Sequence, residues 1–301
     1  MKILITGSHG LVGQALFTSL VQDGHEVVRL VRRQPQFGSP EVEWDPKHGV
    51  IDSAHLEGFD VVVHLAGESI ADGRWTTEKK RRIRESRVQG TEILSQALVR
   101  LSQRPKVFLS ASAIGYYGNR GNEVLDETSH PGSDFLSNVC VQWEQATGPV
   151  AQAGVRTVNL RFGIILSVRG GALAKMLPPF RMGIGGRVGN GKQWMSWIVL
   201  DDVVGAIKHS IGDVSLAGPV NFVAPNPVTN AHFTRELGRT LSRPTLFSVP
   251  EFGARLAFGE MADALLLSSQ RVNPSRLKEA GYQFLEPELP GALRRVLKAN
   301  G

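Results

Sequence analysis

Cysteine is almost absent from the chain, since Cys140 is the single one in 301 residues. One cysteine excludes an internal disulfide framework and any multi-cysteine metal site, and it is consistent with a reducing compartment. No apolar run approaches the roughly 20 residues that span a bilayer. The first residues, MKILITGSHG, lead directly into a strand and a turn, without the segments of a secretory signal. These absences predict a cytoplasmic protein with no membrane partner and no metal site.

The charge of the chain is moderately unbalanced, with a formal net charge of +6 and a pI near 9.7. Such an excess suits either a nucleic-acid partner or a small anionic ligand. The densest basic run is KKRR at residues 79–82, followed by Arg84, in a helical stretch with Glu78 and Glu85 close by. No nucleic-acid-binding module accompanies it. We therefore interpret the run as a solvated helix face that also faces a phosphate-bearing ligand, and we expect no nucleic acid.

Strand-like and helix-like segments alternate from the first residue, which is typical of a parallel sheet covered by helices on both faces. We expect strands at residues 2–6, 26–31, 42–44, 60–66, 106–111 and 156–166. We expect helices at residues 11–22, 76–102 and 133–153. This order predicts an α/β fold with a Rossmann-type doubly wound parallel sheet.

The first turn of this pattern carries three glycines, Gly7, Gly10 and Gly13, between a strand and a helix. The first glycine suits the tight turn, the second lets the backbone approach a pyrophosphate, and the third lets helix and sheet pack closely. The helix N-terminus offers free N–H groups to the phosphates. The alternative is a purely structural turn. We predict a dinucleotide site, with contacts from the glycines and from their neighbours Ser8, Leu11 and Val12.

The end of the second expected strand distinguishes the two nicotinamide cofactors. An acidic side chain there would bind the ribose 2′-hydroxyl and repel a 2′-phosphate. The chain has Arg32 and Arg33 instead. A guanidinium can bind a phosphate through paired hydrogen bonds, so NADP(H) is favoured over NAD(H), although two ordinary surface arginines would have the same sequence.

The last third of the chain has a different composition, with five glycines between residues 183 and 191 and seven prolines after residue 224. Such segments are typical of a smaller, loop-rich lobe that closes over a substrate. The chain also exceeds the usual length of one compact domain. We predict a dinucleotide-binding domain of residues 1–167 with 196–224, and a smaller C-terminal substrate lobe of residues 168–195 with 225–301.

Several motifs resemble the extended short-chain dehydrogenase/reductase superfamily, whose best known members are nucleotide-sugar epimerases and dehydratases. They are TGSHGLVG at residues 6–13, HLAG at 64–67, the serine-tyrosine segment at 110–118, RFGIIL at 161–166 and the pair Asp201-Asp202. More narrowly, the chain is similar to the YfcH-type epimerase family. That likeness is carried by AGESIADGRW (66–75), RESRVQGT (84–91), GGALAKMLPPFRMGIGGRVGNGKQWMSWI (170–198) and SSQRVNPSRLKEAGYQF (268–284).

The resemblance implies further cofactor contacts. Leu65, Ala66 and Gly67 would line the cofactor at the end of the fourth strand, and Arg87 would contact a phosphate or ribose. Ser110 is a further expected cofactor-binding residue. The backbone of Ile164 would meet the nicotinamide end. Each has a structural alternative, such as a buried strand end, a solvated helix arginine or a core isoleucine. The sequence alone leaves these alternatives open.

The catalytic pattern of the superfamily is incomplete in this chain. Its members use a serine or threonine with Tyr-x-x-x-Lys, because the lysine lowers the pKa of the tyrosine and the phenolate then exchanges a proton with the substrate. Alignment puts Leu136 at the tyrosine position and Cys140 at the lysine position. Ser112 remains, and Tyr116 or Tyr117 is near enough to supply a phenol. The alternative for both tyrosines is a structural role. Cys140 is a candidate nucleophile, and the alternative for it is packing on an apolar helix face.

The resemblance also places several polar side chains near a substrate cleft: Glu68, Arg74, Lys175, Arg181, Arg187, Lys192 and Gln193. Their positive charge would suit an anionic substrate, for instance one bearing a nucleoside diphosphate. Trp194 and Trp197 would either stack on a base or sugar or anchor a loop. His64 and Asp202 are interpreted as structural, the first at a strand end and the second capping a helix that begins near Val203.

Two functions are compatible with these residues. The first is an NADP(H)-dependent oxidoreductase or epimerase-like enzyme that transfers hydride, with Ser112 polarising the substrate oxygen and Tyr116 or Tyr117 as the acid/base. The second is a sensor or regulatory protein that keeps the cofactor site without catalysis, as Leu136 and Cys140 suggest. Either would act on or bind a small molecule, as a monomer or homodimer.

Overall fold

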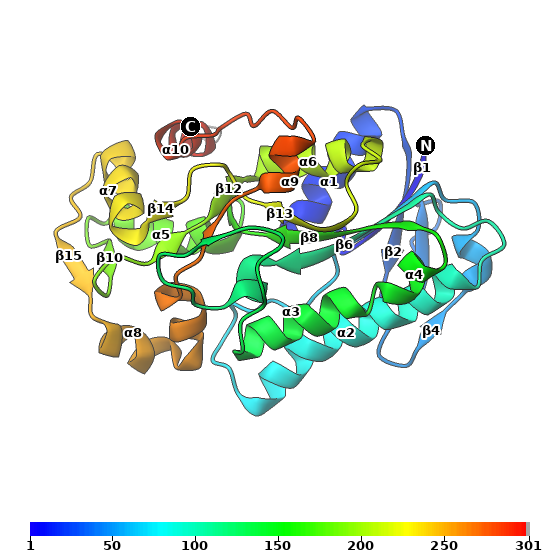
Figure 1. Cartoon of the computed structure of the whole chain (residues 1–301), viewed down its shortest axis with the longest axis horizontal. Coiled ribbons are helices and arrows are strands. Elements are labelled where there is room, and N and C mark those ends of the chain that lie inside the picture. Colours follow the sequence, from blue (N-terminus) through cyan, green and yellow to red (C-terminus); the bar gives the residue numbers. More distant parts are fainter. Residues whose placement is uncertain (299–301) are drawn as a thin grey trace.

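A single large sheet organises the computed structural model, which describes residues 1–298. The strand order is β13-β8-β6-β5-β1-β2-β3-β4, and every neighbouring pair is parallel except β3 and β4 (Figure 1). The strands are β1 (Lys2–Thr6), β2 (Glu26–Val31), β3 (Glu41–Asp45), β4 (Val50–Ile51), β5 (Val61–His64), β6 (Val107–Ala113), β8 (Arg156–Phe162) and β13 (Gly218–Phe222). The predicted Rossmann-type α/β fold is thus confirmed.

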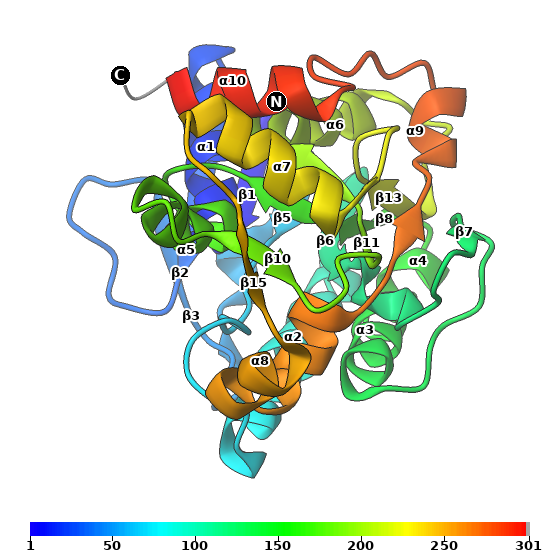
Figure 2. The ribbon, with the colours of Figure 1, turned by 90° about the vertical axis from the view of Figure 1, so that its left-hand side faces the viewer.

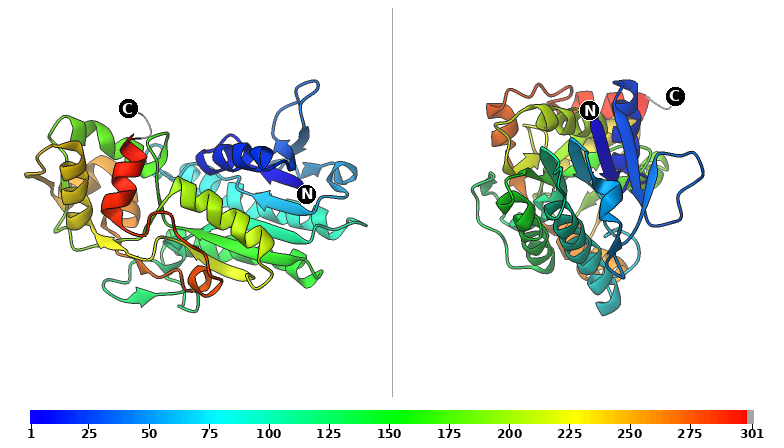
Figure 3. Two further views of the ribbon diagram at one scale, coloured as in Figure 1. Left: turned by 90° about the horizontal axis from the view of Figure 1, so that it is seen from above. Right: turned by 90° about the vertical axis from the view of Figure 1, so that its right-hand side faces the viewer.

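Helices cover both faces of this sheet. One face carries α1 (Leu11–Gln22), α6 (Leu200–Gly212) and α9 (Ser275–Glu279). The other carries α2 (Thr77–Val99), α3 (Phe135–Gln145) and α4 (Gly148–Gln152). Seen from above, α1 and α6 lie side by side (Figure 3). Alternate residues of the central strands enter two separate apolar cores because successive side chains of a strand point to opposite faces: Ile3 and Ile5 to one, Leu4 to the other.

The strand expected at residues 156–166 is interrupted. β8 ends at Phe162, and β9 (Ile164–Leu166) leaves the sheet to pair in parallel with β12 (Trp197–Val199). Gly163 makes the break, since a Cβ there would lie 2.6 Å from both the carbonyl oxygen of Ser196 and Cγ1 of Val223. The chain therefore crosses two other segments at a point where no side chain fits.

The helix expected at residues 133–153 is two helices. Thr147 separates α3 from α4 because its Oγ1 donates to the carbonyl of Glu144 at 2.7 Å, and Pro149 stands in the first turn of α4. A side chain that binds the preceding turn and a proline that lacks an N–H both favour a helix boundary.

Strands β4 and β13 of the large sheet were absent from the sequence prediction, which proposed six strands.

The remaining elements gather at the carboxyl edge of the sheet and build what we call the small lobe (Figure 2). It consists of α5 (Gly171–Arg181), β10 (Gly186–Val188), β11 (Trp194–Met195), β14 (Val228–Thr229), α7 (Asn230–Leu241), β15 (Phe247–Val249), α8 (Glu251–Phe258) and α10 (Leu289–Lys298). Its apolar core joins Leu173, Phe233 and Leu293 from three of these helices. A π-helical turn at Ala262–Leu267 (η3) and the short strands β7 (Val124–Leu125) and β16 (Arg271–Val272) connect it to the sheet.

Among residues 1–298, no helix has the length and apolar character required to cross a membrane.

Candidate functional site

The glycine loop between β1 and α1 has the close contacts that its sequence predicts. Gly7 has φ of 65°, and a Cβ there would lie 2.6 Å from the carbonyl of Leu65. A Cβ on Gly13 would collide with the carbonyl oxygen of Gly7, which itself accepts from the N–H of Gly10 at 2.9 Å. Helix α1 has no side-chain cap and no acidic residue in its first turn. Its first N–H groups are therefore available to an anion.

A buried hydrogen-bond chain holds the carboxyl end of β5 against this loop. Thr6 Oγ1 accepts from the backbone N–H groups of Leu65 and Ala66, so its proton goes to Nδ1 of His64, 2.7 Å away. Thr91 Oγ1 donates to the carbonyl of Arg87 and accepts from Nε2 of His64. His64 is thus the neutral Nε2–H tautomer, and full burial lowers its pKa to about 4. This contact set supports the structural role expected for His64.

The two arginines after β2 have different surroundings. Arg33 Nη2 donates to Glu41 Oε1 at 2.7 Å, and its Nη1 donates to the carbonyl of Gln34. Arg32 is exposed and has no hydrogen bond or ion pair with another described residue. Arg32 is therefore the guanidinium that a phosphate at this strand end can engage without competing with a carboxylate.

Arg87 lies beside Gly67, at the carboxyl edge of β5. Its Nη1 donates to the carbonyls of Glu68 and Ile83 at 3.0 and 3.1 Å, and its guanidinium sits 5.0 Å from the ring centroid of Trp143. Burial lowers the pKa of Arg87. No carboxylate of residues 1–298 forms a salt bridge with it. A half-buried cation without a paired carboxylate is suited to receive an anion from outside the protein.

Ser110 and Ile164, also predicted to contact the cofactor, differ in whether their hydrogen-bonding groups are already used within the protein. The Oγ of Ser110 is fully buried and has no hydrogen-bond partner within the described chain, so a donor or acceptor is still required there. The backbone N–H of Ile164 already donates to the carbonyl of Ser196 at 2.9 Å. Ser8 and the side chains of Leu11 and Val12 lie at the start of α1, where the sequence predicted them.

The predicted catalytic serine belongs to a buried polar network. Ser112 Oγ donates to Glu144 Oε1 at 2.7 Å, and Arg161 binds both carboxylate oxygens of Glu144 at 2.8 and 2.9 Å. Arg161 Nη1 also donates to the hydroxyl of Tyr117, which in turn donates to Asn221 Oδ1 at 2.7 Å. The network therefore links β6, α3, β8 and β13 across the sheet.

The two tyrosines are not equivalent. Tyr117 is fully buried, and burial raises its pKa to about 12, although Arg161 and Asn221 favour its ionised form. Tyr116 is half-buried, its ring lies 3.5 Å from the Arg161 guanidinium carbon, and its hydroxyl has no partner among the described residues. Tyr116 is thus the phenol that can still exchange a proton with a ligand.

The residues at the tyrosine and lysine positions of the superfamily pattern form an apolar contact. Leu136 and Cys140 of α3 pack against Gly115, where a Cβ would meet Leu136 Cβ at 3.5 Å and Cys140 Sγ at 3.8 Å. Burial raises the pKa of the Cys140 thiol to about 12, so it is a neutral packing group.

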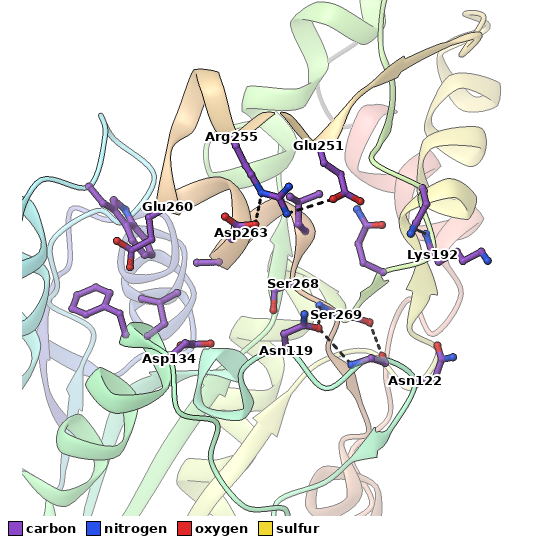
Figure 4. Close-up of a pocket in the computed structure, with 18 residues that line it drawn as sticks. Asn119, Asn122, Asp134, Lys192, Glu251, Arg255, Glu260, Asp263, Ser268 and Ser269 are labelled. Atoms are coloured by element: carbon purple, nitrogen blue, oxygen red, sulfur yellow. Dashed lines mark hydrogen bonds and ion pairs between the residues drawn. The ribbon is translucent and has the colours of Figure 1, made fainter. Parts of the chain in front are cut away.

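A cavity of about 560 Å³ opens next to Leu136, between the sheet and the small lobe (Figure 4). Four carboxylates and two cations belong to its lining, in addition to amides, hydroxyls and the rings of Trp75 and Phe135. Arg255 lies between Glu251 and Asp263, at 3.4 and 2.9 Å. The charged lining residues are Asp134, Glu251, Glu260, Asp263, Lys192 and Arg255.

The cationic cleft expected from the resemblance is not assembled here. Of the seven residues proposed for it, only Lys192 and Gln193 line the cavity. Lys175 binds Asp72 at 2.7 Å and Arg74 donates to carbonyls of α8, while Glu68 pairs with Lys79. The cavity has more negative than positive side chains. The remaining two expected residues, Arg181 and Arg187, are exposed outside the cavity lining.

Contacts bear on three further expectations. Trp197 is fully buried, and its Nε1 donates to the carbonyl of Asn226, so it anchors a loop. Trp194 donates to Asn122 and carries the guanidinium of Arg271 over its ring. Asp202 does not cap α6, which begins at Leu200. Its carboxylate instead accepts from the backbone N–H groups of Leu285 and Glu286 and from the hydroxyl of Tyr282.

The basic run on α2 is largely neutralised by its own surroundings. Lys79 is buried against Glu68, and Arg81 binds Glu78 and Glu85. Lys80 pairs with Glu260 of the small lobe. The interpretation of residues 79–82 as a solvated face is therefore wrong for Lys79, which is 7% exposed. Among the described residues, no cluster of histidine, cysteine and carboxylate side chains could hold a metal ion.

Glu144 and Arg161 are site residues that the sequence did not reveal. Arg161 entered the sequence prediction only as part of RFGIIL, and Glu144 was not proposed as a site residue. The signal available in the sequence was the presence of charged residues in a strand and helix that are otherwise buried, since buried charges are normally paired.

Comparison with known proteins extends over nearly the whole chain. A family model described as the NAD dependent epimerase/dehydratase family matches residues 3–221, and a domain of unknown function (DUF1731) matches residues 249–296. An epimerase family protein of Mycobacterium bovis is 45% identical over 282 residues, which are 94% of this chain and 93% of that protein.

Two solved structures are also similar. The crystal structure of the human epimerase family protein SDR39U1 with NADPH has a TM-score of 0.91 and 32% identity, covering 99% of both chains. The nucleoside-diphosphate sugar epimerase from Corynebacterium glutamicum has a TM-score of 0.81 and 39% identity, covering 99% of this chain and 58% of that one.

Proposed function

The chain belongs to the NAD-dependent epimerase/dehydratase family of the extended short-chain dehydrogenase/reductase superfamily, and we propose that it binds NADP(H) and transfers hydride to or from an alcohol or carbonyl of a small molecule. The long motifs between residues 66 and 284 support placing it in the YfcH-type group. The domain division at residues 167, 195 and 224, a cytoplasmic location and a monomeric or homodimeric state stay predictions.

One arrangement carries the cofactor proposal: the glycine loop beside the uncapped start of α1, with Arg32 unpaired at the end of β2. The loop and helix start suit the pyrophosphate, and Arg32 suits a 2′-phosphate. Arg87 and the unpartnered hydroxyl of Ser110 supply further polar groups along the same edge. The human relative SDR39U1, crystallised with NADPH, agrees with this choice.

Tyr116 is the residue we propose for proton exchange with the substrate oxygen. When bound, the nicotinamide supplies the hydride. The free hydroxyl of Tyr116 can donate to or accept from an alcohol or carbonyl, with the Arg161 cation against its ring face. Ser112 can polarise the same oxygen only if its hydroxyl proton turns away from Glu144 and points to the substrate. Tyr117, engaged at both Arg161 and Asn221, positions Arg161 and does not take part in this exchange.

The substrate proposed from the sequence is a small anion, for instance a nucleoside-diphosphate sugar, and the relative from Corynebacterium glutamicum is named for such sugars. The acidic balance of the cavity gives this choice no support. A neutral alcohol or carbonyl compound therefore stands beside it as a test substrate.

A sensor without catalysis is the second candidate. It is favoured by one observation, namely that the protons of Ser112 and Tyr117 are both donated within the buried network while Leu136 and Cys140 occupy the usual dyad positions. Such a protein would change shape on binding NADPH or NADP⁺ without turning over a substrate.

The deciding experiment is a fluorescence titration of the protein with NADPH and NADH, followed by a screen of the NADPH-loaded protein against carbonyl compounds and nucleotide sugars. Tight NADPH binding with loss of nicotinamide absorbance, abolished by Tyr116→Phe but not by Tyr117→Phe in a folded protein, would establish the enzyme. Binding without turnover across the panel would favour the sensor, and absence of binding would refute both.

A further inference from the structure

An irregular segment, residues 69–75, joins the end of β5 to the start of α2. It runs from the carboxyl edge of the sheet, where the cofactor is proposed to bind, to the small lobe (Figure 1). The backbone of this segment forms neither helix nor strand, and Gly73 adopts φ of 74° with open space around it. We call residues 69–75 the strap. Because an irregular segment lacks the repeated backbone bonds of a helix or sheet, its position depends on the side chains that hold it.

The small lobe holds the middle of the strap through two basic side-chain contacts. Lys175 Nζ of α5 donates to the carbonyl of Ala71 and to Asp72 Oδ1, both at 2.7 Å. Arg74 donates to the carbonyls of Leu256 and Ala257, at the end of α8. The Lys175 ammonium holds the pKa of Asp72 below its usual value. The strap thus ties α5 to α8.

Both ends of the strap are fixed by the sheet domain. At the first end, Glu68 donates its N–H to Ser86, binds Lys79 at 2.7 Å, and accepts from Arg87 at its carbonyl. At the other end, Thr76 caps α2 by accepting from the N–H of Lys79. The sheet domain thus holds the ends of the strap, and the small lobe holds its middle, so a movement between the two would be felt at Asp72 and Arg74.

Helix α5, which holds the strap through Lys175, also lies against the start of α1. Leu11, the first residue of α1, lies 3.5 Å from the position of a Cβ on Gly171, at the start of α5. Lys175 is one helical turn further along α5. The helix that holds Asp72 through Lys175 therefore also borders the start of α1, where the pyrophosphate of the proposed cofactor would bind.

We propose that the strap is a gate for NADP(H), opened by breaking its contacts with Lys175 and α8; this inference rests on the proposed cofactor site. Exposed ion pairs are individually weak, which suits contacts that must break in each binding cycle. Arg87 would connect the gate to the cofactor, because the guanidinium proposed to receive the anion also donates to the carbonyl of Glu68 at the strap's first end.

The test uses stopped-flow NADPH fluorescence to measure the rates of cofactor association and release. Asp72→Lys and Arg74→Ala each remove contacts to the small lobe, and Asp72→Lys combined with Lys175→Asp restores the ion pair with reversed polarity. Arg81→Ala is the matched control, because Arg81 pairs with Glu78 and Glu85 on its own helix. Thermal unfolding verifies that each variant is folded.

For a gate, both rates rise together by about three- to tenfold, as the loss of one or two weak contacts predicts, and the Kd changes less than twofold. The charge reversal then returns both rates toward those of the unchanged protein, and the control leaves them unaltered. A variant that raises only the release rate would show direct cofactor contact and overturn the gate, as would unchanged rates.

Hydrogen exchange in the cofactor-free protein separates this inference from the proposed function. If the unchanged protein fails to bind NADPH, the proposed function falls. Faster exchange of residues 69–75 in Asp72→Lys, reversed in the swapped pair, would still identify a hinged strap. Equal exchange in both would remove the strap as a moving element.

Discussion

At the scale of single residues, the two arginines after β2 differ in whether they are free to bind a phosphate. The Arg32 guanidinium is unpaired, whereas that of Arg33 binds Glu41. The sequence could not distinguish the two arginines, because Glu41 belongs to the next strand and reaches Arg33 only in the folded sheet. The glycine positions were predictable, since each follows from a local strand-turn-helix pattern. Glu144 and Arg161 were not, because their pairing joins α3 to β8 and depends on the tertiary fold.

Cofactor preference should depend on one of the two arginines. Arg32→Ala is expected to weaken NADPH binding about ten- to a hundredfold, as the loss of a charge-assisted hydrogen bond predicts, and to leave NADH binding unchanged. Arg33→Ala is the matched control, with a smaller effect because its guanidinium already serves Glu41. Fluorescence titration with both cofactors measures this. Equal losses for the two arginines would show that both engage the phosphate.

Glu144→Gln should destabilise the fold. It leaves the guanidinium of Arg161, which is 2% exposed, without its carboxylate, and loss of one partner of a buried pair costs about 3 kcal/mol. Urea unfolding measures the change in the free energy of unfolding. Arg81→Ala, which breaks exposed ion pairs, should change it by less than about 1 kcal/mol. Comparable losses for both would mean that the buried network contributes no more than a surface pair.

His64 gives stability a dependence on pH. Its folded pKa of about 4 lies below the ordinary histidine pKa of 6.5, so the unfolded chain binds more protons between these values. Its contribution is complete above pH 6.5 and is lost as the pH falls toward 4, by roughly 3 kcal/mol in all. Unfolding free energies across this range test the slope. His64→Asn should be less stable at pH 7 and should lose most of this slope; an unaltered slope would assign it to other groups.

At the scale of elements, the strand and helix boundaries that were predicted correctly are those marked by local sequence signals. β1, α1 and β2 lie at the expected residues, because apolar runs and glycine turns delimit each of them. The short β13 and β4 were missed, since two to five residues at a sheet edge carry little periodicity and depend on a distant partner. The same reason explains why β9 was joined to β8.

The break at Gly163 should be intolerant of a side chain. Gly163→Ala would place a methyl 2.6 Å from Ser196 O and Val223 Cγ1, and overpacking of this kind costs about 1–3 kcal/mol. Gly212→Ala, where a Cβ meets nothing within 4 Å, is the matched control. Melting temperatures should fall for the first variant and stay level or rise slightly for the second. A stable Gly163→Ala would show that β12 can shift away from β9.

At the scale of the whole molecule, two apolar cores lie on the faces of the sheet and a third lies within the small lobe. The cofactor edge and the cavity both lie where the lobe meets the carboxyl ends of the strands. The α/β class followed from the alternation of elements along the chain. The acidic balance of the cavity did not follow from the sequence, because Asp134 meets the carboxylates of residues 251–263 only through the tertiary fold.

The last helix should matter to the small lobe and not to the sheet. Leu293→Ala removes a fully buried side chain from the lobe core and is expected to cost about 2–4 kcal/mol. Hydrogen exchange should rise in α5 and α7 while β1 and β5 remain protected. Arg294→Ala, on an exposed position of the same helix, is the control. Uniform loss of protection throughout the chain would show that lobe and sheet unfold as one unit.

The position of α10 also sets an order for synthesis. The small lobe's core begins with Leu166 and is completed by Leu289, Ala292 and Leu293, the last buried residues of the described chain. A ribosome builds this chain from its N-terminus, so the sheet strands through β8 can pair while the lobe still lacks one wall. During that interval the apolar sides of α5 and α7 face water, and a nascent chain stalled before residue 289 presents them to chaperones and proteases.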